Sequence, residues 1–106
     1  MSNEQIIEKE IQEKGLNAPR LTPEDIDAVI IAEDYHVFDG TTTTVCCLTI
    51  RYGFTVIGKS APVSDENFDE EIGRKVSRED ARRQIWALEG YLLREQLSMA
   101  DHPDAS

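Results

Sequence analysis

His36 is the one histidine in the central part of the chain, so it is the first candidate for a general base. Its nucleophilic partner would be Ser60 or Cys46, in a Ser–His–carboxylate or Cys–His set. Neither the spacing nor the neighbouring residues match such a catalytic arrangement. We therefore expect no catalytic residues. An enzyme of unknown type is only the second alternative to a binding protein.

The residues that commonly bind metals do not combine into a ligand set either. Cys46 and Cys47 are adjacent, and neighbouring side chains on a strand point to opposite faces, so a disulfide between them is geometrically poor. His36 and His102 do not complete the spacing of a zinc site. The acidic residues within 65–71 lack the pattern of a calcium loop and are interpreted as a solvated helix start. We expect no metal and no cofactor.

A group of basic residues stands out against an acidic background. It comprises Arg74, Lys75, Arg78, Arg82 and Arg83. Arg78 and Arg82 are one helical turn apart, so they share a helix face and are candidate ligand-binding residues for an anion. The alternative is that this group forms salt bridges with Glu79, Asp80 and the acidic cluster, and the sequence leaves both interpretations open.

The chain has 106 residues, 40% of them hydrophobic and 30% charged, and a net charge of −10. This length predicts a single domain, over residues 1–98, before a C-terminal tail at 99–106 that we expect to be disordered. The charge argues against general binding to nucleic-acid phosphates or to an anionic membrane, and it is compatible with a basic partner. No apolar run is long enough to span a bilayer and no signal peptide is recognisable, so we expect a cytoplasmic protein.

Three helices are expected. The first covers 3–14, with Ile6, Ile7 and Ile11 on one side and Gly15 at its end, and the second begins at the capping residue Thr22. A short helical turn at 68–72 should be broken by Gly73. The longest helix should then run over 77–97 from Ser77, with an apolar stripe at Ala81, Ile85, Leu88 and Leu92. Gly90 inside this helix costs about 1 kcal/mol relative to alanine, which indicates a packing reason.

Three strands are expected between these helices. They cover 34–38, 42–52 and 54–59, separated by turns at Asp39-Gly40 and at Gly53. The predicted fold class is α+β, with a three-stranded antiparallel β-meander packed on the long C-terminal helix and short N-terminal helices beside it. Such a small sheet leaves apolar surface exposed, so we expect a homo-oligomer. The candidate interface residues are Ile7, Ile11, Trp86 and Gly90.

Several sequence blocks resemble one known family. These are RLTPEDI at 20–26, GFTVIGKSA at 53–61, NFDEEIGR at 67–74 and IWALEGYL at 85–92. Together they make the chain similar, over about residues 5 to 97, to the "Gp forty-nine-like" family of small tailed-phage and prophage proteins (phage N4 and phage Sf6 type). The chain departs from the expected pattern at Tyr52, before Gly53, and at Pro62, after Ser60-Ala61.

The resemblance implies a small non-enzymatic phage accessory protein in the cytoplasm of the host bacterium, and our first interpretation is that it binds a host protein. The family is also similar to anti-Thoeris sponges, which sequester cyclic nucleotide immune signals. That link implies an oligomeric ligand trap in which Phe54 or Tyr52 stacks on a base and Arg78 and Arg82 hold phosphates. Both interpretations remain open, and so does a structural role in the virion.

Overall fold

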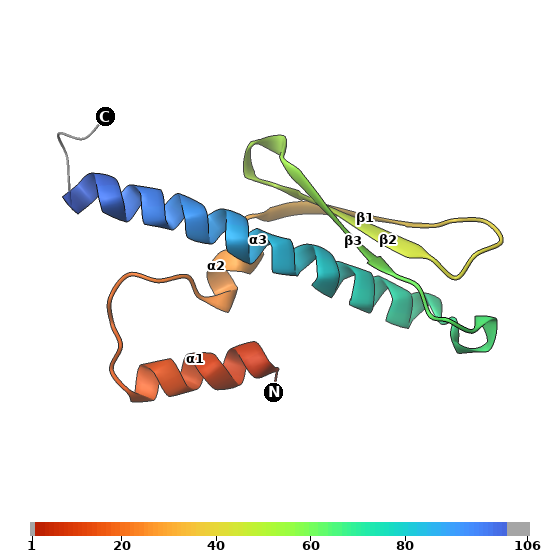
Figure 1. The fold of residues 1–106 in the computed structure, drawn as a ribbon, viewed down its shortest axis with the longest axis horizontal. Helices are drawn as coiled ribbons and strands as arrows, with labels where there is room; N and C mark the ends of the chain where they lie inside the picture. Colours follow the sequence, from red (N-terminus) through yellow and green to blue (C-terminus); the bar gives the residue numbers. More distant parts are fainter. Residues whose placement is uncertain (1, 102–106) are drawn as a thin grey trace.

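The protein is described from a computed structural model that covers residues 2–101. Helices and strands follow the order α1 (Asn3–Glu13), α2 (Pro23–Ala28), β1 (Ile30–Val37), β2 (Thr44–Ile50), β3 (Thr55–Ser60) and α3 (Glu70–Asp101), with short 3-10 turns η1 (Arg51–Gly53) and η2 (Asp65–Asn67). The strands form one sheet and α3 crosses one of its faces (Figure 1). The predicted α+β class is confirmed.

The sheet is an antiparallel meander with the strand order β1-β2-β3. Cys46 lies opposite Tyr35 on β1 and opposite Gly58 on β3, while Cys47 lies opposite Asp34 and Ile57. Because side chains alternate along a strand, Cys46 faces α3 and Cys47 faces the open side of the sheet. β1 begins at Ile30, four residues before the expected start, with a bulge between Ile30 and Ala32.

The starts of the first two helices are fixed by side-chain caps. Thr22 accepts a hydrogen bond from the Asp25 backbone N–H, and the Asp25 carboxylate accepts one from the Thr22 backbone N–H, so both members of a capping box are present. Ser2 and Gln5 form the same arrangement at α1. Gly15 follows α1 with a φ of +68°, which explains why the helix ends there.

The long helix differs from the expectation, because it starts at Glu70 and passes through Gly73 without a break. Asp69 caps it: its carboxylate accepts a hydrogen bond from the Ile72 N–H at 2.9 Å. Ser77 is therefore not a cap but a buried residue inside the helix. Gly73 is tolerated because a Cβ there would lie 2.7 Å from the Thr44 Oγ1, so the helix gains a close contact with β2.

The core lies between α3, α2 and the helix-facing side of the sheet. Its members are Ile26, Val29, Cys46, Leu48, Ile50, Val56, Ala81 and Ile85. Gly58 lets β3 approach α3, since a Cβ there would lie 2.2 Å from both the Ala81 N and the Ser77 carbonyl oxygen. By contrast, a Cβ at Gly90 would meet only Leu21 at 3.8 Å, so the expected packing reason for Gly90 is not found within the chain.

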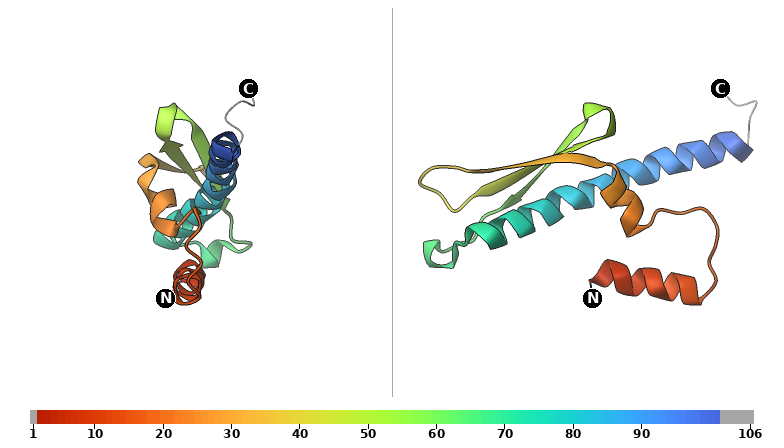
Figure 2. Two further views of the ribbon diagram at one scale, coloured as in Figure 1. Left: turned by 90° about the vertical axis from the view of Figure 1, so that its left-hand side faces the viewer. Right: turned by 180° about the vertical axis from the view of Figure 1, so that it is seen from behind.

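The last turns of α3 extend beyond the sheet, and α1 lies apart from it (Figure 2). The radius of gyration is 17.3 Å, compared with about 13 Å for a compact domain of this size. The helix includes Met99 to Asp101, so that part of the expected tail is helical, and 102–106 lie outside the described residues. Within 2–101, no helix is both long and apolar enough to cross a membrane.

Candidate functional site

The turn between β2 and β3 carries two exposed aromatic side chains. Tyr52 has a φ of 66° and is 94% exposed, and Phe54 is 56% exposed. Gly53, between them, has a φ of +78°, which residues other than glycine rarely adopt. The left-handed backbone at both Tyr52 and Gly53 turns the chain tightly and holds the Tyr52 ring in solvent.

This turn and the middle of α3 enclose a hollow of about 480 Å³, which we call the turn–helix hollow. It is lined by Ile50, Arg51, Tyr52, Gly53, Phe54, Leu88, Glu89 and Leu92. Arg51 forms an ion pair with Glu89, and its guanidinium carbon lies 5.8 Å from the centre of the Tyr52 ring. Because these two charges pair with each other, the hollow offers an apolar wall with a neutralised polar edge.

The basic group that the sequence singled out is fully engaged in ion pairs. Arg74 pairs with Glu70, Lys75 with Glu71, Arg78 with Glu33, Arg82 with Glu4 and Asp27, and Arg83 with Asp80. Three of these pairs join residues that are one helical turn apart on α3. The others connect α3 to α1, α2 and β1. Arg74, Lys75 and Arg83 have partners that the salt-bridge alternative named, whereas Arg78 and Arg82 pair with residues that it did not name, on β1, α1 and α2.

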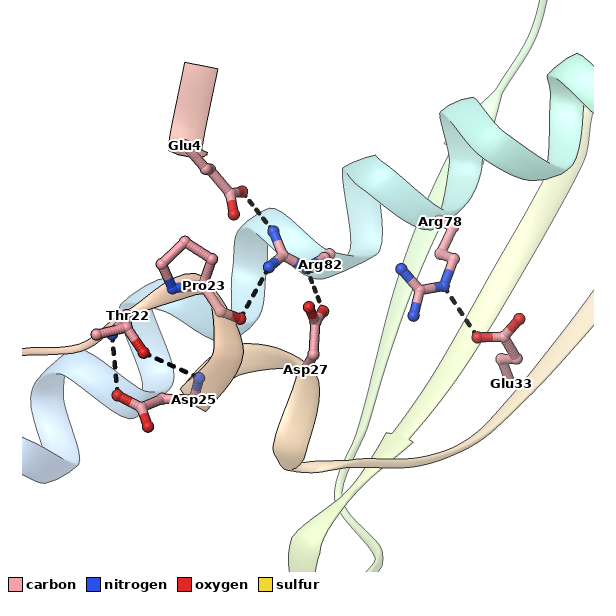
Figure 3. A network of polar contacts seen from close by, with 8 residues as sticks. All are labelled: Glu4, Thr22, Pro23, Asp25, Asp27, Glu33, Arg78 and Arg82. Carbon is pink, nitrogen blue, oxygen red and sulfur yellow. Dashed lines mark hydrogen bonds and ion pairs between the residues drawn. The ribbon is translucent and has the colours of Figure 1, made fainter. Parts of the chain in front are cut away.

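Arg82 is the most buried of these bases, with 8% of the residue exposed. Its Nε donates to the Asp27 carboxylate at 2.8 Å, its Nη2 donates to the Pro23 carbonyl at 3.1 Å, and its Nη1 pairs with Glu4 (Figure 3). One guanidinium thus connects three helices. Each of its three nitrogens donates to a partner within the chain, so its fork is already engaged by protein groups.

Arg78 is directed at the sheet. Its Nε donates to the Glu33 carboxylate on β1 at 2.9 Å (Figure 3). This hydrogen bond lowers the pKa of Glu33 below its ordinary value and raises the pKa of Arg78. Both shifts favour the charged forms, as expected for a stabilising ion pair.

The four predicted ligand-binding residues do not meet in one hollow. Tyr52 and Phe54 line the turn–helix hollow, whereas Arg78 and Arg82 border a separate depression between α1, α2 and α3. That depression also contains Glu4, Glu24, Asp27 and Glu79, so its acidic residues outnumber its basic ones. It is a poor receptor for phosphates.

The four predicted interface residues lie in different environments. Ile7 is 56% exposed on α1, and Ile11 is half-buried. Trp86 is half-buried against the core, and Gly90 follows it by one helical turn. α1 has no buried residue, so it presents apolar surface without burying it within the chain.

The residues considered for catalysis lie on opposite sides of the sheet. His36 is opposite Val45, while Cys46 and Thr44, whose partner is Ser60, face α3. His36 therefore cannot form a pair with either candidate nucleophile, and its ring instead makes an edge contact with Phe38 at 4.8 Å. Burial raises the pKa of the Cys46 thiol, which makes it less reactive. Both cysteines are free, and within residues 2–101 no cluster of three or more metal-binding side chains is found.

The family resemblance singled out Tyr52 and Phe54, but the sequence did not reveal the residues of α3 that line the hollow. Leu88 and Leu92 were assigned to the apolar stripe that should pack on the sheet, and yet Leu88 is 40% exposed. The apolar stripe on α3 continues past the last residue that the sheet covers. The stripe is longer than the predicted strands, and this difference in length could have indicated that its last leucines are not covered by the sheet.

Residues 21–97 match the profile of the Phage protein (N4 Gp49/phage Sf6 gene 66) family. The chain belongs to this family of phage proteins. The match confirms the resemblance drawn from the sequence, and it starts at α2, so α1 lies outside it. Comparison with curated proteins and with solved structures gave no match.

Proposed function

We propose that this phage-family protein acts by binding a host protein, without catalysis, through the turn–helix hollow. The observation that carries the proposal is that two exposed aromatic residues, Tyr52 and Phe54, line the same hollow as the exposed Leu88 and the half-buried Leu92. Exposed aromatic residues around an apolar hollow are typical of protein-binding sites, where they fill or receive side chains of the partner.

The charges of the molecule support a protein partner over an anionic one. The net charge is −10, and each member of the basic group is already paired. A partner with basic residues around an apolar anchor would complement this surface, because charge complementarity raises the association rate and suppresses wrong partners.

Affinity capture from host bacteria with matched variants tests this proposal. Leu88→Gln changes the hollow, whereas Ile72→Gln changes another exposed aliphatic residue, on the first turn of the same helix. We expect a host protein that is retained by the parent chain and by Ile72→Gln but lost with Leu88→Gln. Equal retention by all three chains would contradict binding at the hollow.

Tyr52→Asn provides a second change at the same place. Asparagine tolerates a positive φ, so this variant removes the ring without straining the turn. The captured protein should again be lost. The melting temperature of each variant is the control. A value equal to that of the parent chain means that the captured protein is lost through the changed surface and not through unfolding.

A second candidate function is sequestration of a cyclic nucleotide. It is favoured by one observation, the exposed Tyr52 and Phe54 rings beside Arg51, since aromatic rings stack on bases. Differential scanning fluorimetry against cyclic mono-, di- and trinucleotides and ADP-ribose derivatives tests it. Ligand at 100 times its Kd should stabilise the protein by about 2.7 kcal/mol, or roughly 10 °C. If no ligand in the panel raises the melting temperature, this second function is contradicted and the protein-binding function is favoured.

We also propose that the protein is a homo-oligomer. α1 exposes Ile6 and Ile7, and the end of α3 exposes Tyr91 and Met99. These side chains are apolar and lie on the two elements that extend away from the sheet. A second copy that covers them would remove this surface from water.

A further inference from the structure

The two edges of the sheet are treated differently by the rest of the chain. β1 and β3 are both edge strands, and an edge strand presents unpaired N–H and C=O groups that can bind another strand. At β3 these groups are occupied by side chains of α3. The Lys59 N–H donates to the Asp80 carboxylate at 2.9 Å, and Gln84 Nε2 donates to the Ile57 carbonyl at 2.6 Å.

The β1 edge has no such cover. The Phe38 N–H donates to the Thr43 carbonyl across the β1–β2 turn. Since hydrogen-bonding direction alternates along a strand, the backbone groups of Glu33, Tyr35 and Val37 point away from β2. No hydrogen bond from elsewhere in residues 2–101 reaches them. This edge is therefore a preformed template for a fourth strand.

Charge determines which strand fits the template. Residues 21–50 contain six carboxylates and no lysine or arginine. Glu33 is paired with Arg78, but Asp34 is exposed and forms no ion pair with another described residue. If two copies paired through the middle of β1, Asp34 would face its counterpart, and like charges directly opposite each other destabilise a sheet. A basic strand would instead place lysine or arginine there.

We propose that the open edge of β1 binds an extended, basic peptide segment of a partner protein by strand addition. Main-chain hydrogen bonds to Glu33, Tyr35 and Val37 would supply the affinity, and Asp34 would select for positive charge. This surface is distinct from the turn–helix hollow, so the inference goes beyond the proposed function and does not depend on it.

Nuclear magnetic resonance with a synthetic peptide of alternating basic and β-branched residues tests the proposal. On titration at low salt, we expect shifts and slowed hydrogen exchange at the amides of Glu33, Tyr35 and Val37. The same peptide with N-methylated backbone nitrogens, and an acidic counterpart, should not produce them. Absence of protection at these amides with the basic peptide, or shifts confined to the turn–helix hollow, would overturn the proposal.

Two charge-reversal variants separate local from overall charge. Asp34→Lys places a positive charge beside the template, and Glu95→Lys makes the same change in net charge on the exposed end of α3. Asp34→Lys should weaken peptide binding about fivefold, while Glu95→Lys should leave it unchanged. Equal weakening by both variants would show a nonspecific charge effect and overturn the proposal. So would β1 protection that rises with protein concentration without peptide, since a second copy would then occupy the edge.

Discussion

At the scale of single residues, replacing either of two glycines by alanine should change the unfolding free energy in opposite directions. Gly58→Ala would force a Cβ to 2.2 Å from backbone atoms of Ser77 and Ala81, which cannot move without shifting α3. We expect a loss of about 3 kcal/mol in unfolding free energy. Gly90→Ala meets only the far end of Leu21 at 3.8 Å, so helix propensity should raise stability by up to about 1 kcal/mol. Urea unfolding measures both changes.

The Gly90→Ala variant also tests the predicted role of Gly90 in an interface between copies. If a second copy approaches the helix backbone there, Gly90→Ala will stabilise the isolated chain yet weaken its association. Urea unfolding and light scattering on one sample distinguish these effects. A destabilised Gly90→Ala chain would mean that the glycine is needed within the chain, contrary to its surroundings in the structure.

Asp80 makes stability depend on pH. The Lys59 backbone N–H, with help from Arg83, holds the pKa of this carboxyl below its ordinary value of 3.8. A pKa that is lower in the folded state gives stability that is present at neutral pH and is lost as the pH falls below about 4. The Asp80 side chain is 38% exposed, so water screens its interactions. Asp80→Asn should therefore cost only about 0.5 kcal/mol at pH 7, and the difference should shrink on acidification. A difference that stays constant down to pH 2.5 would refute this assignment.

At the scale of helices and strands, Arg82 holds the N-terminal helices against α3. Its contacts with Glu4, Asp27 and Pro23 span 55 to 78 residues of sequence. Arg82→Gln should lower the unfolding free energy by about 2 kcal/mol, because the buried guanidinium and its hydrogen bonds to Asp27, Glu4 and the Pro23 carbonyl are lost together. Arg83→Gln is the matched control: its side chain is 69% exposed, and the loss should stay below about 0.5 kcal/mol.

Hydrogen exchange extends this prediction to α1. α1 buries no residue, and its ion pairs with Arg82 and Arg20 tie it to the rest of the chain. In Arg82→Gln the α1 amides should exchange faster, while those of β2 should change only with global stability. If Arg82 were reserved for a ligand, its replacement would leave both stability and α1 exchange unaltered.

Short-range sequence patterns predicted the order of the helices and strands, but they did not predict the tertiary contacts between α3 and the sheet. The Thr22 cap and the meander were predictable because capping residues, turn glycines and β-branched runs act over a few positions. Gly73 was interpreted as a helix breaker, since its contact with Thr44 becomes visible only after the helix has crossed the sheet. The hollow was not predicted: Gly53 marks the turn locally and the family resemblance singled out Tyr52 and Phe54, but the position of this turn against Leu88 depends on the crossing of α3.

At the scale of the whole molecule, the chain is too extended for an isolated domain. Its dimensions are 56 × 35 × 20 Å, and its radius of gyration is 17.3 Å, against about 13 Å for a compact domain of about this length. The length comes from α1 and the end of α3 (Figure 2), and both elements expose apolar side chains: Ile6 and Ile7 on α1, and Tyr91 and Met99 on α3. An exposed apolar surface of this kind is typical of an interface between copies.

Multi-angle light scattering after size exclusion should therefore give at least twice the chain mass of 12.0 kDa. Replacing Ile7 and Ile11 together by glutamine removes two of the three isoleucines on the apolar side of α1 and should shift the protein toward the monomer. Ile57→Gln, at a residue that is 58% exposed on the open side of the sheet, is the control and should leave the mass unchanged. If Ile57→Gln dissociated the oligomer instead, the interface between copies would lie on the open side of the sheet and not on α1. A monomer at every concentration would contradict the homo-oligomer, because the apolar side chains of α1 would then stay exposed without a second copy to cover them.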